Sequence, residues 1–313
     1  MAISSVLGSS ALLPAGLGFR NIVINGGFDV WQRGTTAAIP SSVGTSYLAD
    51  RWSAYRPAVG STQSRVTAGL DGFQYALRIQ RDSGNTGTGV IYVNQSFETS
   101  TMVKLANKQV TLSFYARAGA NYSSASSLFN ARVVAGTGTE ANIIFTGVTG
   151  STEPVTTTPT LTTSWQRFTA TGLIPSGTNG GGVYFYFTPV GTAGANDYVD
   201  ITGVQLEQNY QPTPFEQRPI GVELELCQRY FQISDAAIAG YATGGLQPAS
   251  YFKTIVTMRT TPTITVVTAP TYTNSSGLTS DIISKDGNRF YFTVTSTGMG
   301  YCDSFVYSSS AEL

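Results

Sequence analysis

The chain has 313 residues, and its 18 Lys and Arg balance its 18 Asp and Glu, so the formal net charge is zero. Histidine is absent, which excludes catalysis that depends on a neutral imidazole and disfavours the usual zinc sites. Without a basic excess or a basic stripe, we expect no nucleic-acid partner. Charged residues make up only 12% of the chain while Gly reaches 34, a composition typical of β-proteins that pack against copies of themselves.

The first segment, taken as residues 1–20, carries no charge before Arg20. It lacks the positive start of a secretory signal, and its apolar runs are too short to span a bilayer. We therefore expect neither a signal peptide nor membrane insertion. An uncharged apolar arm has to bury against something, and we predict that it docks on another protein. The predicted docking residues are Ile3, Val6, Leu7, Leu12, Leu13 and Leu17.

The next two hundred residues read as β-strands separated by turn-forming clusters. Alternation of apolar and polar residues with many Thr, Val, Tyr and Phe is typical of half-buried antiparallel strands. Expected strands are Asn21–Ile24 leading into Phe28–Val30, Tyr75–Gln80, Val110–Arg117, Asn142–Thr146, Trp165–Thr171, Val183–Phe187 and Tyr198–Leu206. This number of strands predicts an all-β fold, with a jelly-roll β-sandwich over residues 21–211.

A Pro-rich connector over residues 212–220 follows the sandwich. A helix is expected from Val222 to about Ile233, because Val222, Leu226, Tyr230 and Ile233 form one apolar stripe. The strand pattern then returns, so residues 221–313 are predicted to form a short helix and a smaller C-terminal β-domain. Its expected strands are Phe252–Met258, Thr263–Val267, Phe290–Val294 and Phe305–Tyr307.

Aromatic residues are the first candidates for a site. Trp31, Trp52 and Trp165 could stack on sugars, but each lies beside an Arg in a strand-like phrase, and we favour core tryptophans packed under the Arg stems. Along Val183–Phe187, Tyr184 and Tyr186 alternate with Phe185 and Phe187, so one of these pairs faces away from the core. That outward pair is a candidate for glycan contact or for a subunit interface.

No residue pattern points to catalysis. The close carboxylate pairs Glu223/Glu225 and Asp197/Asp200 are explained by a helix surface and a strand end. Phosphate-binding, zinc-hydrolase and serine-hydrolase motifs are absent from the sequence, so we expect no catalytic residue and no required cofactor. Cys227 and Cys302 have no CxxC partner; we favour buried free thiols, and a disulfide between them stays open.

Several phrases, in this order, resemble a module of phage tail-fibre and virion-appendage proteins, cyanophage proteins included. They are Asn25-Gly-Gly-Phe-Asp-Val-Trp-Gln-Arg-Gly, Tyr47-Leu-Ala-Asp-Arg-Trp, Val110-Thr-Leu-Ser-Phe-Tyr-Ala-Arg, Trp165-Gln-Arg-Phe, Val204-Gln-Leu-Glu, Thr213-Pro-Phe-Glu-Gln-Arg-Pro, Glu223-Leu-Glu-Leu-Cys-Gln-Arg-Tyr-Phe, Met258-Arg-Thr-Thr-Pro-Thr and Ser310-Ala-Glu-Leu. The resemblance covers about residues 20 to 313. It implies a jelly roll akin to carbohydrate-binding modules, assembled as a homotrimer on a virion.

The resemblance also suggests a structural calcium that ties the first strand to the last. The matching positions are Asn25, Asp29 and Asp200, but Gly27 stands where the family often has Asp, which removes one potential ligand.

The prediction is thus a virion protein, assembled in the bacterial host cytoplasm, that serves as a tail-fibre or baseplate-appendage subunit. Its expected partners are further copies of itself, a tail or baseplate protein bound through the arm, and host envelope polysaccharide. The alternative is a capsid-decoration or collar protein without a receptor.

Overall fold

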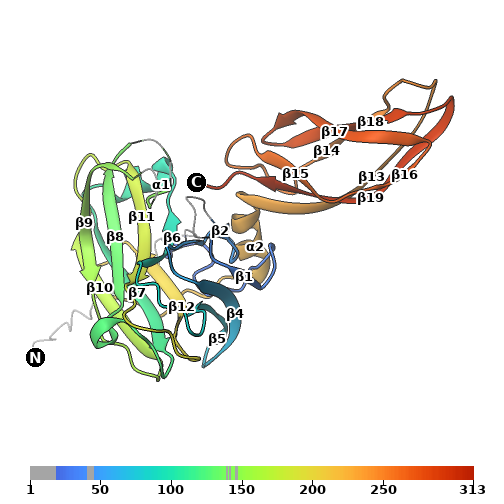
Figure 1. Ribbon diagram of the computed structural model, residues 1–313. Coiled ribbons are helices and arrows are strands. Elements are labelled where there is room, and N and C mark those ends of the chain that lie inside the picture. Colours follow the sequence, from blue (N-terminus) through green and yellow to red (C-terminus); the bar gives the residue numbers. More distant parts are fainter. Residues whose placement is uncertain (1–18, 41–45, 139, 141, 145–146) are drawn as a thin grey trace, which may run out of the picture.

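The computed structural model describes residues 19–40, 46–138, 140, 142–144 and 147–313, so the predicted docking residues of the arm lie outside the described part. The larger part of the molecule is built around two packed six-stranded antiparallel sheets (Figure 1). In spatial order, sheet A contains β1 (Thr36–Ala38), β4 (Ser61–Leu70), β5 (Phe73–Arg81), β12 (Tyr198–Glu207), β7 (Gln109–Ala118) and β10 (Gln166–Leu173). Sheet B contains β2 (Ser46–Tyr47), β3 (Ser53–Tyr55), β6 (Ile91–Ser96), β11 (Gly180–Phe187), β8 (Asn130–Thr137) and β9 (Thr149–Thr157).

The core of this sandwich lies between the two sheets and follows from the alternation of the strands. Phe185 on β11 and Phe114 on β7 meet there with ring centroids 5.0 Å apart, and Phe129 stacks on Phe185 at 5.7 Å. Trp52 is 1% exposed and lies 5.1 Å from the Phe28 ring. Burial of these large rings from both sheets supplies much of the hydrophobic stabilisation.

A smaller β-unit follows the sandwich, and we call it the C-terminal unit (residues 231–313). One of its sheets contains β13 (Phe231–Ala242), β19 (Gly298–Ser310), β15 (Thr263–Thr268) and β16 (Thr271–Thr273). The other contains β14 (Ala249–Lys253), β18 (Gly287–Val294) and β17 (Ser275–Ser284). Among the described residues, the helical segments are α1 (Thr99–Leu105), a single 3-10 turn at Ala125–Ser127, and α2 (Ile220–Gln228), which precedes β13. The structure confirms the predicted fold class, a jelly-roll sandwich followed by a helix-linked smaller β-unit, while the residue boundaries of the domains stay predictions.

Four predicted elements differ from the structure. Helix α2 ends at Gln228, and the residues expected in its last turn begin β13 at Phe231, where they pair with β19. The apolar stripe therefore combined helical residues with Tyr230 of the following turn and Ile233 of a strand. The strand expected at Phe252–Met258 is displaced, because β14 runs from Ala249 to Lys253 and shares only two residues with it. Residues 142–144 form a turn rather than a strand.

Residues Asn21–Val30 also form no strand, because side-chain amides bind much of their backbone, while Ile22 and Gly26 make single backbone bonds to β12. The Asn25 side chain accepts from the amide of Val30 and donates to its carbonyl at 3.0 and 2.9 Å. The Gln95 side chain likewise accepts from the amide of Ile24 at 2.8 Å and donates to its carbonyl at 2.7 Å. Asn25 and Phe28 have φ values of 55° and 57°, which a regular strand does not allow.

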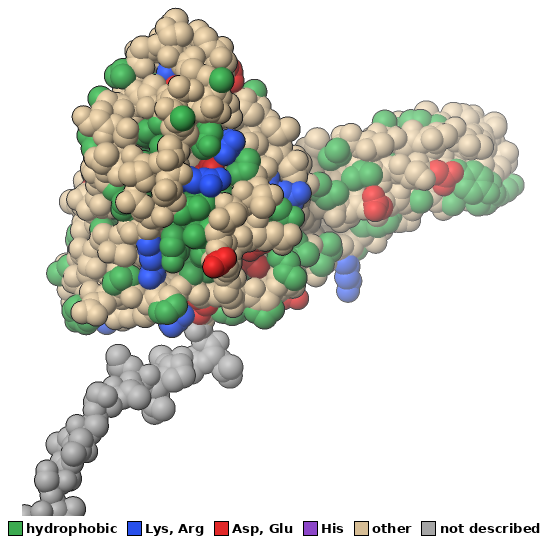
Figure 2. Space-filling model, turned by 90° about the horizontal axis from the view of Figure 1, so that it is seen from below, with side chains coloured by type: hydrophobic (Ala, Val, Ile, Leu, Met, Phe, Trp, Pro, Cys, Tyr) green, Lys and Arg blue, Asp and Glu red, His purple; other side chains and the backbone are tan. Residues whose placement is uncertain are grey.

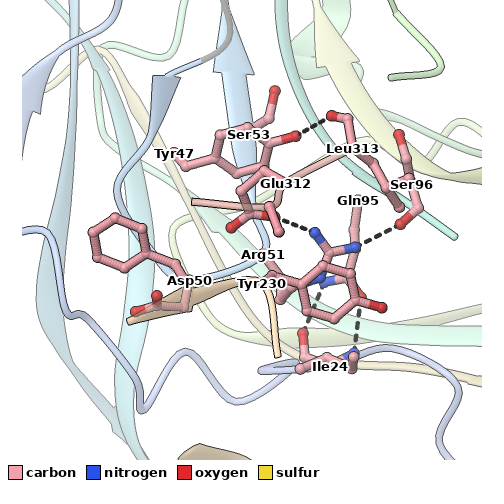
Figure 3. Close-up of polar contacts among 12 residues, drawn as sticks. Ile24, Tyr47, Asp50, Arg51, Ser53, Gln95, Ser96, Tyr230, Glu312 and Leu313 are labelled. Atoms are coloured by element: carbon pink, nitrogen blue, oxygen red, sulfur yellow. Dashed lines mark hydrogen bonds and ion pairs between the residues drawn. The ribbon is translucent and has the colours of Figure 1, made fainter. Parts of the chain in front are cut away.

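The two parts of the molecule meet at a buried polar joint (Figure 3). Arg51 is 2% exposed there; it forms an ion pair with Glu312, donates to the Ser96 carbonyl at 2.8 Å and lies 3.6 Å from the centroid of the Tyr230 ring. The Tyr47 hydroxyl donates to the Leu313 carbonyl at 2.5 Å. The last described residues therefore return from the C-terminal unit and bind the sandwich.

Further ion pairs surround this joint. Arg33 bonds Asp50 at 3.2 Å and Glu312 at 3.0 Å, so it links the sandwich to the returning segment. Glu98 accepts bonds from Arg229 at 3.0 Å and from the Tyr230 hydroxyl at 2.6 Å. Because these charged groups are partly or wholly buried, each depends on its partner to offset its desolvation.

Candidate functional site

Tyrosine side chains gather on the outer face of sheet B, the face that points away from the core. The strand register places Tyr92 of β6 between Tyr55 of β3 and Tyr186 of β11. Two residues before Tyr186 on β11, Tyr184 lies opposite Asn94 on β6 and Arg132 on β8. The alternation that turns Phe185 and Phe187 into the core therefore presents the intervening tyrosines outward. We call Tyr55, Tyr92, Tyr184 and Tyr186 the tyrosine face.

The four rings form a continuous aromatic surface. Tyr55 stacks on Tyr92 with an interplanar angle of 15° and centroids 6.5 Å apart. Tyr92 in turn lies 5.6 Å from Tyr186 and 6.3 Å from Tyr184. Tyr184 and Tyr186 stack at 5.7 Å and 21°. All four side chains are half-buried, so their ring faces are held by neighbours while part of each stays accessible.

Polar groups border the tyrosine face on β8 and β9. The Tyr184 hydroxyl donates to Glu153, and Arg132 pairs with the same carboxylate at 3.3 Å. Arg132 also donates to Asn130 at 2.9 Å and to Thr158 at 3.0 Å. The rim therefore presents amide, hydroxyl and one balanced ion pair, a set of donors and acceptors that suits a neutral polyhydroxylated ligand.

The hydroxyl groups of Tyr92 and Tyr184 stay protonated at neutral pH. Burial, followed by the bond to Glu153, raises the pKa of Tyr184 well above its usual value. Burial, with the neighbouring Tyr186 and Tyr55, also raises the pKa of Tyr92. Both of these hydroxyls are therefore neutral; the Tyr184 hydroxyl donates its proton to Glu153 and can still accept a hydrogen bond.

The structure decides which of the two predicted pairs faces outward. Phe185 and Phe187 are each 1% exposed and belong to the core, while Tyr184 and Tyr186 lie on the outer face. The prediction did not include Tyr55, Tyr92 or Arg132. The alternation Ile91-Tyr-Val-Asn could have identified Tyr92 as an outward residue of a strand. Its place beside Tyr186 depends on strand register, which the alternation does not give.

The three tryptophans have different surroundings. Trp52 is a core residue, as favoured, and Trp31 is half-buried and donates to the Phe28 carbonyl at 2.5 Å. Trp165 is half-buried beside Arg117, whose guanidinium lies 4.7 Å from the ring centroid. The sequence neighbours expected to cover these rings lie elsewhere: Arg33 stacks on Phe231, Arg51 on Tyr230, and Arg167 lies near Tyr115.

The three residues predicted to bind calcium have separate partners. Asp200 is fully buried and is bonded by Arg78 and Arg117. The Asn25 side chain bonds the backbone of Val30 and Asp50. Burial raises the pKa of Asp29, and the nearby Glu223 adds to this effect. Within the described ranges, no three His, Cys, Asp or Glu residues are close enough to hold a metal ion, and the calcium site stays a prediction.

Two further observations concern predicted features. Cys227 and Cys302 are both buried and both free. In the part of the chain that the structure describes, no helix has the length and hydropathy needed to cross a bilayer. The surface in Figure 2 is mostly neutral, with charged side chains scattered among polar and hydrophobic ones.

Comparison with known proteins gives weak structural similarities. No family model matches the sequence, and no curated protein matches it. A solved structure described as CBM4 is 19% identical and aligns over 59% of this chain and 98% of its own, with a TM-score of 0.37. TmCBM61 in complex with β-1,4-galactotriose is 14% identical over 61% of this chain and all of its own, at 0.35.

A third similar structure is the enzymatically active domain of tailspike protein 4 of bacteriophage CBA120. It is 11% identical, and the match spans 61% of this chain but only 22% of the tailspike chain, with a TM-score of 0.35. At these scores the similarities identify neither a family nor a ligand. The jelly-roll assignment rests on the chain's own two sheets and their register.

Proposed function

We propose that this chain is a non-catalytic virion protein, a tail-fibre or baseplate-appendage subunit that binds host-surface glycan through the tyrosine face. The observation that carries the proposal is the set of four adjoining tyrosines on the outer face of sheet B. The virion setting is supported by the tail-fibre-like phrases of the sequence and by its low content of charged residues.

The chemistry of the tyrosine face suits a sugar chain. The C–H face of a pyranose packs on an aromatic ring, and adjacent rings provide positions for successive sugar units. Tyr184 and Tyr186 are held by stacking on each other, so little side-chain entropy is lost on binding. The donors and acceptors on Arg132, Asn130 and Thr158 lie at the rim, where sugar hydroxyls would reach them.

The first experiment measures binding of the purified full chain to intact host cells and to their extracted envelope polysaccharide. We expect saturable binding that soluble polysaccharide competes. Replacing both Tyr184 and Tyr186 with Ala should weaken binding by about fivefold per lost stacking contact, since each is worth about 1 kcal/mol. The matched control is Tyr210→Ala, because Tyr210 is 77% exposed and lies outside the tyrosine face.

Equal binding by the double variant and the wild-type chain would contradict the assignment of the site. Absence of binding by a well-folded wild-type assembly would favour the alternative, a decoration or collar protein without a receptor. Incubation with the polysaccharide should release no reducing ends, and their release would overturn the non-catalytic assignment.

The same proposal includes assembly on the particle. We expect a homotrimer, to be checked by the mass of the purified protein in solution, and docking through residues 1–20. Deletion of residues 1–18 should abolish incorporation into particles while the remaining chain keeps its melting temperature. Normal incorporation of the deleted chain would refute docking by this arm.

A further inference from the structure

A second polar site lies on the opposite side of the sandwich, on the outer face of sheet A. The register places Arg78 of β5, Asp200 of β12 and Arg117 of β7 in one row across three adjacent strands. Arg78 donates to both carboxylate oxygens of Asp200, at 2.7 and 2.9 Å, and Nε of Arg117 donates to one of them at 2.9 Å. One buried carboxylate therefore holds two guanidinium groups side by side.

This row carries one positive charge in excess. Among the described residues, Arg78 and Arg117 form ion pairs with Asp200 alone. Their side chains are 21% and 25% exposed, whereas Asp200 is fully buried beneath them. Nη1 of Arg78 and both Nη atoms of Arg117 lie outside the bonds to Asp200, so donors remain for a further acceptor.

Aromatic rings fix the two guanidinium groups. Arg78 lies 3.5 Å from the centroid of Tyr198, and Arg117 lies 4.7 Å from that of Trp165. The Trp165 indole donates to the Ala68 carbonyl at 2.8 Å. Ala68 lies on β4 and Trp165 directly precedes β10, and β5, β12 and β7 lie between these two strands in sheet A. The end of β4 therefore bends over the outer face and holds Trp165 beside Arg117.

A second feature explains why the end of β4 and the start of β5 can approach this closely. Gly203 on β12 has a φ of 60°, and a Cβ at this position would lie 2.7 Å from Phe73 and 2.9 Å from Tyr115. Without a side chain there, the Phe73 and Tyr115 rings meet across β12 at 5.3 Å. The hairpin formed by β4 and β5 therefore packs closely on sheet A. The Arg117 guanidinium and the Trp165 indole are thus held in place before any ligand binds.

From these contacts we propose that the outer face of sheet A binds a carboxylated sugar unit, a hexuronate within an acidic glycan. The sugar carboxylate accepts hydrogen bonds from guanidinium donors of Arg78 and Arg117 that Asp200 does not use, and these suit a planar carboxylate. The sugar ring packs against Trp165 or Tyr198. This site does not depend on the tyrosine face, which lies on the other sheet and has a balanced ion pair at its rim.

The test is calorimetric titration of the full chain with an oligogalacturonate and with a neutral galacto-oligosaccharide of the same length. We expect the acidic oligomer to bind in a salt-dependent manner. Arg117→Gln should weaken this binding at least about tenfold, through loss of charge-assisted hydrogen bonds. Arg117→Lys should restore it only in part, because an ammonium group does not provide the planar pair of donors.

The control is the double variant Tyr184→Ala, Tyr186→Ala, which should bind the oligogalacturonate as the wild-type chain does. If the double variant loses binding to the neutral galacto-oligosaccharide but still binds the oligogalacturonate, the tyrosine face is impaired and the second site is intact. The two proposals are thus tested separately. Unchanged oligogalacturonate binding by a folded Arg117→Gln variant would overturn the inference. Equal competition by sulfate at matched ionic strength would also overturn the inference, since it would show a general anion site that does not recognise the sugar ring.

Discussion

The sandwich and the C-terminal unit differ in the size of their hydrophobic cores. The sandwich buries large rings from two six-stranded sheets, whereas the C-terminal unit has a small core around Phe290, Phe305 and Tyr307. The C-terminal unit also exposes many large hydrophobic side chains, among them Tyr241, Leu246, Ile255, Val267 and Ile282. A small β-unit buries a lower fraction of its surface, so the C-terminal unit depends more on its joint with the sandwich.

The largest expected effect tests the core of the sandwich. Phe185→Ala should lower the free energy of unfolding by about 4 kcal/mol, because the ring contacts Phe114, Phe129 and Trp52 and its removal leaves a cavity. Denaturant unfolding measures the change. The adjacent outward residue gives the matched control, and Tyr184→Ala should cost about 1 kcal/mol or less. A similar cost at both positions would contradict the assignment of the two faces.

The next largest effect tests the joint. Arg51→Ala should cost about 3 kcal/mol, because buried Glu312 then keeps only Arg33 as a cationic partner and the Ser96 carbonyl loses its donor. The C-terminal unit should lose protection from hydrogen exchange before the sandwich does. Replacing Arg51 with Met and Glu312 with Leu together should restore most of the stability, since no unpaired charge remains. If the single and double variants unfold alike, the ion pair does not hold the joint.

A pH series tests the same joint through Asp50. Burial is the main cause that raises its pKa from 3.8 to about 6, and Arg33 and Gln32 only partly oppose it. The folded chain then binds the Asp50 proton more tightly than the unfolded chain does. Relative to Asp50→Asn, the wild-type chain should therefore gain stability as the pH falls from 7 to 4, by about 2 kcal/mol, and change little below that.

Glu98 provides a comparison of opposite sign. Burial alone would raise its pKa, but hydrogen bonds from Arg229 and Tyr230 lower it below 4.5. Relative to Glu98→Gln, the wild-type chain should lose stability as the pH falls below about 4.5. Chemical unfolding of all three chains across this range gives both difference curves. Curves of the same sign would show that the joint does not distinguish the two carboxylates.

The smallest expected effect lies within the C-terminal unit. Ile282 is 60% exposed and has a φ of 46°, in a register shift of β17 against β18. A β-branched residue is strained in this left-handed region, so Ile282→Asn should raise the free energy of unfolding by about 1 kcal/mol. A higher melting temperature would show this gain. The control is Ile283→Asn at the next position, which should give no such gain.

Sequence reasoning reached the fold because the alternation of apolar and polar residues carries it. At Val183–Phe187 the pattern gave both the strand and the two alternating faces, and only the direction of each face needed the structure. It failed at Asn21–Val30, where the side chains of Asn25 and Gln95 replace a neighbouring strand. Such a replacement leaves no periodic signal.

The candidate site was predicted only in part, for a related reason. Tyr184 and Tyr186 lie in one strand and share one pattern, but Tyr55 and Tyr92 reach them through pairing between strands. The same holds for Arg78, Asp200 and Arg117, which belong to three strands. Strand order and register are set by the whole core, and a single sequence does not reveal them.

The ion pair between Arg51 and Glu312 joins residues that are 261 positions apart in the chain. During synthesis, the ribosome completes every strand of the sandwich long before Glu312 emerges. The sandwich can therefore fold while the chain is still being made, and Arg51 lacks its ion-pair partner until Glu312 has been added. Closure of the joint therefore follows folding of the sandwich, so any copy whose synthesis stops before Glu312 presents a folded sandwich without a fixed C-terminal unit.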